Sequence, residues 1–162
     1  MKTFLLLRIL LALHITGIII MAGATMIDYL TFKTFWKLAD QGDVRSAGLL
    51  PLMAKFGAFV RTGAAIILLT GGAMLIVGKG VWWQQPWFKI KMGLVLLLVL
   101  HGSLIGNKQG QKLRETAWAH GADFMQRTMD LRENLNRFYL IQLTLFFLLI
   151  LISIIKVNRI SN

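Results

Sequence analysis

The chain has 162 residues, of which 56% are hydrophobic, and it carries 18 Lys and Arg against seven Asp and Glu. A soluble domain of this length cannot bury so much apolar surface, so the composition places the chain in a bilayer. The absence of cysteine excludes disulfides, thiolate-held iron–sulfur clusters, cysteine zinc sites and cysteine nucleophiles. The net charge of +11 is typical of contact with anionic lipid headgroups and does not indicate nucleic-acid binding. No nucleotide-binding or hydrolase motif is present in the sequence.

Four apolar stretches predict membrane spans, because about 20 apolar residues cross about 30 Å of hydrocarbon. They cover about residues 4–30, 52–77, 87–106 and 138–157. Arg8 and His14 interrupt the first stretch, which continues to Leu30, so we interpret it as a retained helix and not as a cleaved signal peptide. The short connections predict a single all-α domain over residues 1–162, a four-transmembrane-helix bundle with up-down-up-down topology.

The connections before and after the third predicted span contain recognisable patterns. Pro86 lies among three tryptophans, a pattern typical of an interfacial anchor followed by a helix start at the third span. Residues 107–136 carry many of the charges, with apolar residues at loosely helical spacing. We predict that they form an amphipathic helix or helical extensions of the third and fourth spans, lying at the membrane surface. The alternative is a solvated helix that covers the end of the bundle. His120 lies in this connection, outside the spans, and we leave it out of the candidate site.

Charge is distributed unequally between the two ends of the predicted bundle. All seven acidic residues belong to the end that holds the first and third connections. Orientation depends on Lys and Arg in short loops. Their overall number places the acid-containing end in the cytoplasm, whereas Lys2 and Arg8 at the start of the first span favour the opposite orientation. The sequence therefore leaves the orientation open.

His14 lies deep in the first apolar stretch, where an ionisable or metal-ligating side chain indicates a functional site. Gly17, Met21 and Ala24 follow at i+3, i+7 and i+10, on about the same helical face. Small residues on that face let a helix backbone or a flat macrocycle approach closely. His14 is therefore a candidate ligand with Gly17 and Met21 beside it. In the alternative interpretation, the small residues only pack helices and His14 bonds to a neighbouring carbonyl.

His101 lies near the end of the third span, which runs parallel to the first, so we expect both histidines to face the bundle interior. Their positions within the spans predict an axial offset of about 9 Å. A single haem held by both His14 and His101 then requires tilt or different span boundaries. Two separate sites, or one histidine opposed by Met or Lys, are the alternatives.

Arg61 and Lys91 are the basic residues placed to meet an acidic cofactor. Arg61 is predicted to lie within about two helical turns of the depth of His101, and Lys91 about 15 Å from His101 along the same helix. A guanidinium group binds carboxylates bidentately, so a haem propionate is a candidate partner for Arg61. Snorkelling to headgroups or pairing with a loop acid is the alternative for this residue.

Two segments resemble a known family. The run Trp87-Phe88-Lys89-Ile90-Lys91-Met92-Gly93-Leu94-Val95, continuing to Leu100-His101-Gly102, and the run Leu13-His14-Ile15 resemble the corresponding helices of HemJ-type membrane proteins. That family and the related CopD-like bundles are small helical proteins of the bacterial inner membrane. HemJ-type members bind b-type haem and are linked to protoporphyrinogen oxidation. The resemblance implies that His14 is a haem ligand and that Lys91 is the important lysine of the family's Trp-x-x-x-Lys helix.

The chain departs from the HemJ pattern after the first histidine. The family carries an aromatic-rich stretch there with Pro-Arg and a further His, whereas this sequence reads Met21-Ala22-Gly23-Ala24-Thr25-Met26-Ile27-Asp28-Tyr29. The resemblance therefore implies a haem-binding bundle more strongly than it implies porphyrinogen oxidation.

Three functions are compatible with these residues. The first is a haem b-binding membrane redox protein, with His14 and His101 as candidate axial ligands and a quinone or porphyrinogen as redox partner. The second is a copper handling or transport protein that offers soft ligands to Cu(I) from His14, Met21, Met26 and Met74. The third is a cofactor-free structural or accessory subunit. The sequence leaves open whether the chain is an enzyme and whether it forms a homo-oligomer.

Overall fold

The computed structural model describes residues 2–118 and 124–160, and in these residues the chain is an all-α bundle. Its helices are α1 (Lys2–Asp40), α2 (Arg45–Val77), α3 (Pro86–His101), α4 (Asn107–Trp118) and α5 (Phe124–Ile160). A short 3₁₀-helix, Val81–Gln84, precedes α3, and a π-helical segment, Gly102–Gly106, joins α3 to α4. His120 lies outside the described residues.

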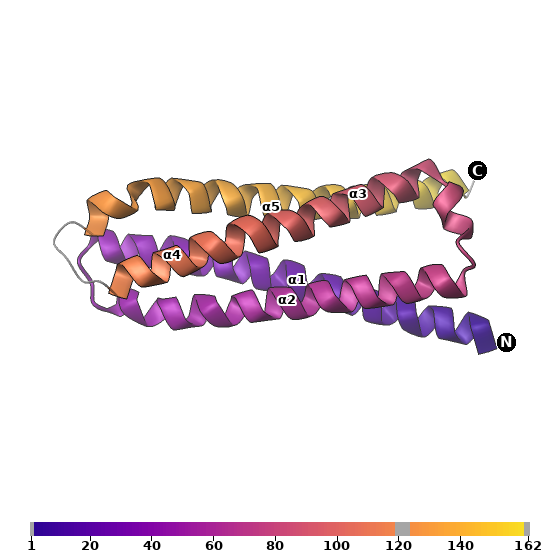
Figure 1. Cartoon of the computed structure of the whole chain (residues 1–162), viewed down its shortest axis with the longest axis horizontal. Coiled ribbons are helices and arrows are strands. Elements are labelled where there is room, and N and C mark those ends of the chain that lie inside the picture. Colours follow the sequence, from indigo (N-terminus) through magenta and orange to yellow (C-terminus); the bar gives the residue numbers. More distant parts are fainter. Residues whose placement is uncertain (1, 119–123, 161–162) are drawn as a thin grey trace.

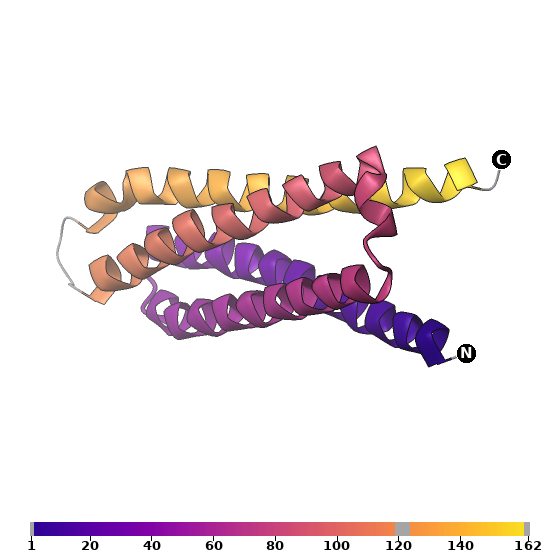
Figure 2. The ribbon, with the colours of Figure 1, turned by 45° about the vertical axis from the view of Figure 1, so that its right-hand side comes forward.

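The bundle has the predicted up-down-up-down arrangement (Figure 1). α1 and α2 run antiparallel, α3 continues through the π-helical segment into α4 as one long rod, and α5 returns beside that rod (Figures 1 and 2). In the described part of the chain, α1, α2, the α3–α4 rod and α5 contain the four helical segments that are long and apolar enough to cross a membrane. The prediction of an integral membrane four-helix bundle is confirmed.

The helices extend beyond the predicted apolar spans. α1 has 39 residues, which corresponds to about 58 Å at about 1.5 Å per residue, whereas the hydrocarbon layer is about 30 Å thick. Residues 107–118 prolong the third span and residues 124–137 precede the fourth within α5, so the predicted helical extension of these spans is confirmed. Residues 41–44 are the only connection left between α1 and α2.

Two buried clusters follow each other along the bundle. The first, which we call the inner cluster, consists of Met21, Ile67, Leu98, Leu145 and Phe146. The second, which we call the aromatic cluster, consists of Phe32, Phe35, Trp36, Leu50, Met53, Leu113, Leu131, Leu135, Phe138 and Tyr139. Its rings pack edge to face or tilted, a preferred arrangement for aromatic pairs.

The tryptophan-rich end locates the hydrocarbon layer along the bundle. Trp83, which is 55% exposed just before α3, belongs at the level of the headgroups. About 20 residues counted from Pro86 end near Gly106, and about 20 counted back from Val77 on α2 end near Gly57. The inner cluster therefore lies within the hydrocarbon, whereas most of the aromatic cluster lies in the part of the bundle that extends beyond it.

The turn between α1 and α2 lies at this extended end and is fixed by local hydrogen bonds. Gly42 has φ +68°, a left-handed conformation that favours glycine, and its N–H donates to the carbonyl of Ala39. The Asp43 carboxylate accepts hydrogen bonds from the backbone N–H and the guanidinium of Arg45. These bonds to Arg45 hold the pKa of the Asp43 carboxyl below its usual value. The turn thus needs only four residues to reverse the chain.

α1 and α2 approach each other almost backbone to backbone. Gly17 and Gly63 are both buried at their crossing. A Cβ atom added at Gly63 would lie 2.8 Å from the backbone nitrogen of Met21 and 2.9 Å from the carbonyl oxygen of Gly17. A Cβ atom at Gly17 would lie 3.0 Å from side-chain atoms of Ile66 and Ile67. Small residues allow this close packing, which contributes to helix association in membranes.

We predict that Gly63→Ala destabilises the bundle by about 1–3 kcal/mol, because the added methyl group overpacks against backbone atoms that cannot move aside. Thermal unfolding in detergent, followed by circular dichroism, measures the effect. Gly93→Ala is the matched control, since a Cβ atom at Gly93 would meet nothing within 4 Å. Equal melting temperatures for the two variants would contradict the backbone crossing.

Candidate functional site

Two neighbouring cavities lie between the α1–α2 pair and the α3–α4 rod with α5. The large cavity has a volume of about 480 Å³, and the small cavity has a volume of about 180 Å³. Both are lined by residues from α1, α2, α3 and α5. Four residues form walls of both cavities: Met21, Ala64, Leu98 and Val99. Two of them, Met21 and Leu98, belong to the inner cluster, so this cluster separates the cavities.

His14 lines the small cavity and is held by a hydrogen bond to α2. Its Nδ1 lies 2.9 Å from Oγ1 of Thr70, and the same hydroxyl donates its single hydrogen to the carbonyl of Ile66 at 2.6 Å. The Thr70 oxygen can therefore only accept in its contact with His14, so Nδ1 carries the imidazole proton. The lone pair is then on Nε2, while the Nδ1–Cε1 edge lies against Thr70 and Gly71. A histidine that donates from one ring nitrogen is prepared to ligate through the other.

Lys91 and Met21 line the small cavity together with His14. They come from different helices, Met21 from α1 and Lys91 from α3, and Met21 is 3% exposed. The remaining lining is mostly apolar and includes Phe146 and Leu149 of α5. The small cavity therefore combines one imidazole, one thioether and one amine in apolar surroundings, from three residues that the sequence analysis singled out.

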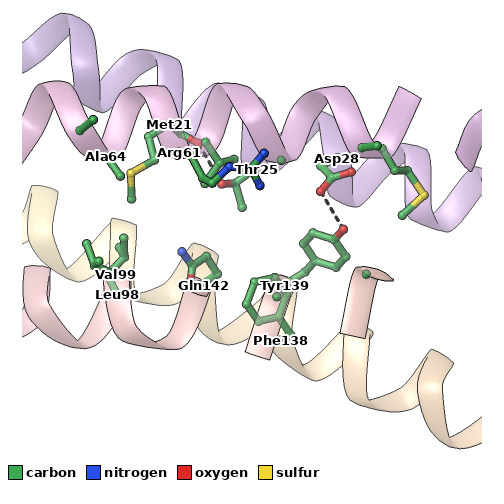
Figure 3. A pocket seen from close by; sticks show the side chains of 18 of the residues that line it. Met21, Thr25, Asp28, Arg61, Ala64, Leu98, Val99, Phe138, Tyr139 and Gln142 are labelled. Carbon is green, nitrogen blue, oxygen red and sulfur yellow. Dashed lines mark hydrogen bonds between the residues drawn. The ribbon is translucent and has the colours of Figure 1, made fainter. Parts of the chain in front are cut away.

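Arg61 lines the large cavity, and so does Asp28, a carboxylate near the end of the first predicted span. The hydroxyl of Tyr139 donates a hydrogen bond of 2.8 Å to Oδ2 of Asp28, and this pair faces the cavity from α5 and α1 (Figure 3). Tyr139 is also packed against Tyr29, with ring centroids 5.5 Å apart. The protein itself thus supplies a carboxylate to the cavity that contains Arg61.

His101 lies beside the large cavity but is not part of its lining. Its Nδ1 is 3.1 Å from Oε1 of Gln142, and because an amide oxygen only accepts, Nδ1 is the donor. The ring is stacked on Phe138, with centroids 5.0 Å apart. The π-helical segment begins at the next residue, Gly102, and such segments occur often at functional sites. His101 therefore positions Gln142, which does line the cavity.

The two histidines lie at different levels of the bundle. His101 is paired with Gln142, whereas the small cavity that holds His14 is lined on α5 by Phe146 to Ser153. Gln142 and Ile150, eight residues apart on α5, are separated by about 12 Å along the axis. This arrangement corresponds to separate sites, one of the alternatives that the sequence left open.

Two other predicted residues lie outside the cavities. Gly17 lines neither cavity, and its notch is filled by α2, so the helix-packing alternative describes its position. Met26 is 57% exposed and, like Met74, lines neither cavity, so the structure does not bring together the four-residue copper set. Among the described residues, no three His, Cys, Asp or Glu side chains are grouped to hold a metal ion.

The sequence did not predict the four polar residues that bond between helices at these sites: Thr70, Asp28, Tyr139 and Gln142. Gln142 could have been predicted as a site residue, because an amide inside an apolar span needs a hydrogen-bond partner. Asp28 could have been predicted for a similar reason, since it lies two residues before the end of the first predicted span. The partners themselves depend on helix register, which no local pattern defines.

Comparison with known proteins gives no relative: no protein-family model, no curated protein and no solved structure matches this chain.

We predict that Tyr139→Phe destabilises the protein by about 1–3 kcal/mol, because it removes a hydrogen-bond donor to the half-buried Asp28 carboxylate. Tyr29→Phe is the matched control: the Tyr29 hydroxyl donates only a long bond of 3.4 Å to Asn136, so its loss has a smaller effect. Thermal unfolding in detergent compares the two variants. A larger loss of stability for Tyr29→Phe would show that the Tyr139–Asp28 bond is unimportant.

Proposed function

We propose that this chain is a haem b-binding integral membrane redox protein of the bacterial inner membrane, with His14 as an axial ligand. The observation that carries the proposal is the hydrogen bond from Nδ1 of His14 to Thr70, which leaves the Nε2 lone pair on the imidazole of a cavity-lining residue. Metal-ligating histidines are oriented in this way by donating their other N–H.

The donor set around His14 fits haem. If haem is bound, His14 and Met21 would be the residues that hold its iron, and Lys91 would offer a cation to a propionate from the same cavity. The apolar lining by residues such as Leu98 and Phe146 suits the porphyrin ring. The cavity of about 180 Å³ is smaller than the ~300–1,000 Å³ typical of ligand pockets, so the helices that line it would have to move apart to admit haem.

When bound, haem supplies one-electron transfer at a potential set by its axial ligands and surroundings. The residues of the chain hold and orient it. Thr70 fixes the ring of His14, and the closely packed α1–α2 pair keeps Thr70 in place. The apolar lining of the small cavity excludes water. Lys91 lies five residues after the first residue of α3, near the tryptophan-rich membrane interface, and would hold a propionate there.

We predict that the protein, purified in detergent from haem-supplied cells, is coloured and shows a Soret band, and that His14→Ala loses at least about 90% of the bound haem because one axial ligand is missing. His101→Ala retains the band, since His101 lines neither cavity. An unchanged spectrum in His14→Ala contradicts the ligand assignment. A colourless wild-type protein contradicts the proposed function; with stoichiometric copper it favours copper handling, and without metal an accessory subunit.

We also predict that Met21→Leu retains most of the haem but changes its reduced spectrum and lowers its midpoint potential. The substitution conserves volume, so the fold tolerates it, whereas the thioether ligand that raises the potential is lost. Redox titration followed by absorbance measures the change. Met26→Leu is the control, because Met26 is 57% exposed and lies outside both cavities. Identical potentials in wild type and Met21→Leu would exclude Met21 as a ligand.

A further inference from the structure

The large cavity contains a buried hydrogen-bond donor that points into it. Gln142 is 2% exposed, and its Oε1 accepts the hydrogen bond from His101. The amide nitrogen therefore lies on the other side, toward the space between the helix pairs (Figure 3). A buried amide N–H without an acceptor is unfavourable, so this position suits a ligand that carries a carbonyl oxygen.

The charges of the large cavity favour a neutral ligand. Arg61 and Asp28 both line it, so a cation and a carboxylate of the protein are present together. A carboxylic acid or a phosphate bound there would face the Asp28 carboxylate in surroundings of low dielectric, where repulsion between like charges is strong. A neutral molecule that exchanges hydrogen bonds with Gln142 and with the Tyr139–Asp28 pair avoids this repulsion.

The volume and location of the large cavity restrict the class of ligand further. Its volume of about 480 Å³ lies in the range of ~300–1,000 Å³ for ligand pockets. Asp28 and Tyr139 lie toward one side of the cavity, and Leu98 and Val99 toward the other (Figure 3). Gly57 and Gly106, near the boundary of the hydrocarbon, also line it. The position of these residues therefore suits an amphipathic ligand, with a polar group at the boundary and an apolar part in the hydrocarbon.

We propose that the large cavity is a quinone site, in which a quinone carbonyl accepts a hydrogen bond from the Gln142 amide and His101 positions that amide. A redox role for this quinone rests on the proposed haem function, because the haem would be its electron-transfer partner. Met21 and Leu98 would lie between the quinone and the small cavity that contains His14. The binding of the quinone is independent of haem and is tested separately.

The first test fills the cavity without disturbing the packing. A Cβ atom at Gly57 would meet only a guanidinium nitrogen of Arg61, at 3.8 Å, so the side chain in Gly57→Leu extends into the cavity. Gly93→Leu is the matched control, since Gly93 lines neither cavity and its Cβ atom would meet nothing within 4 Å. Calorimetric titration of the full chain in detergent with decyl-ubiquinone is expected to show at least tenfold weaker binding for Gly57→Leu and unchanged binding for Gly93→Leu.

The second test addresses the donor. Gln142→Leu and His101→Ala are each expected to weaken decyl-ubiquinone binding at least threefold, while oleate, an anion with a similar apolar chain, binds the wild type at least tenfold more weakly than the quinone. Circular dichroism verifies that each variant is folded. Equal quinone binding by wild type, Gly57→Leu and Gln142→Leu overturns the proposal. The proposal is also overturned if the wild type binds oleate more tightly than decyl-ubiquinone and Gly57→Leu abolishes that oleate binding.

Different results would contradict the proposed haem function and the proposed quinone site. Quinone binding that depends on Gly57 and Gln142 in a protein without a Soret band supports the quinone site and contradicts the haem function. A Soret band that depends on His14, together with no binding of decyl-ubiquinone to the wild type, supports the haem function and overturns the quinone site.

Discussion

The close crossing of α1 and α2 at Gly17 and Gly63 determines where space remains in the bundle. These two helices meet with their backbones in contact, which positions the ring of His14 against Thr70. The α3–α4 rod and α5 carry larger side chains toward the centre, among them Leu98 and Phe146. They stand further from the α1–α2 pair, and the two cavities lie in the gap. Small residues at one interface thus leave cavities at the other.

Polar groups inside the bundle need hydrogen-bond partners within the protein, because hydrocarbon offers none. Within and near the hydrocarbon, Thr25 and Thr70 bond to carbonyls of their own helices. His14, His101 and Asp28 instead have hydrogen-bond partners on other helices, and each of these bonds also fixes the helix register. Beyond the hydrocarbon, Arg132 contacts both the Asp40 carboxylate and the ring of Trp36. Such exposed pairs contribute little to stability, so the aromatic cluster holds that end together.

The sequence predicted the four spans and the topology because apolar length is a local property, measured directly along the chain. It did not predict how far α1 and α2 continue, because residues 31–51 contain charges and have the composition of a connection. They are helical in the structure, where Phe35 and Trp36 are buried in the aromatic cluster. It singled out His14, Lys91 and Met21, which do share one cavity. The partners Thr70 and Gln142 depend on the rotation and register of neighbouring helices, and these are set by packing between residues distant in sequence.

His14 and His101 lie at different levels of the bundle and have different surroundings. The imidazole of His14 lines the small cavity with its proton held by Thr70, whereas His101 lies behind Gln142 and is hydrogen-bonded to that amide. A ligand in the large cavity would be in contact with Met21 and Leu98, which also line the small one. In the proposed function, electrons would cross this shared wall inside the hydrocarbon. Protons would reach the polar end near Asp28 and Tyr139 at the membrane boundary.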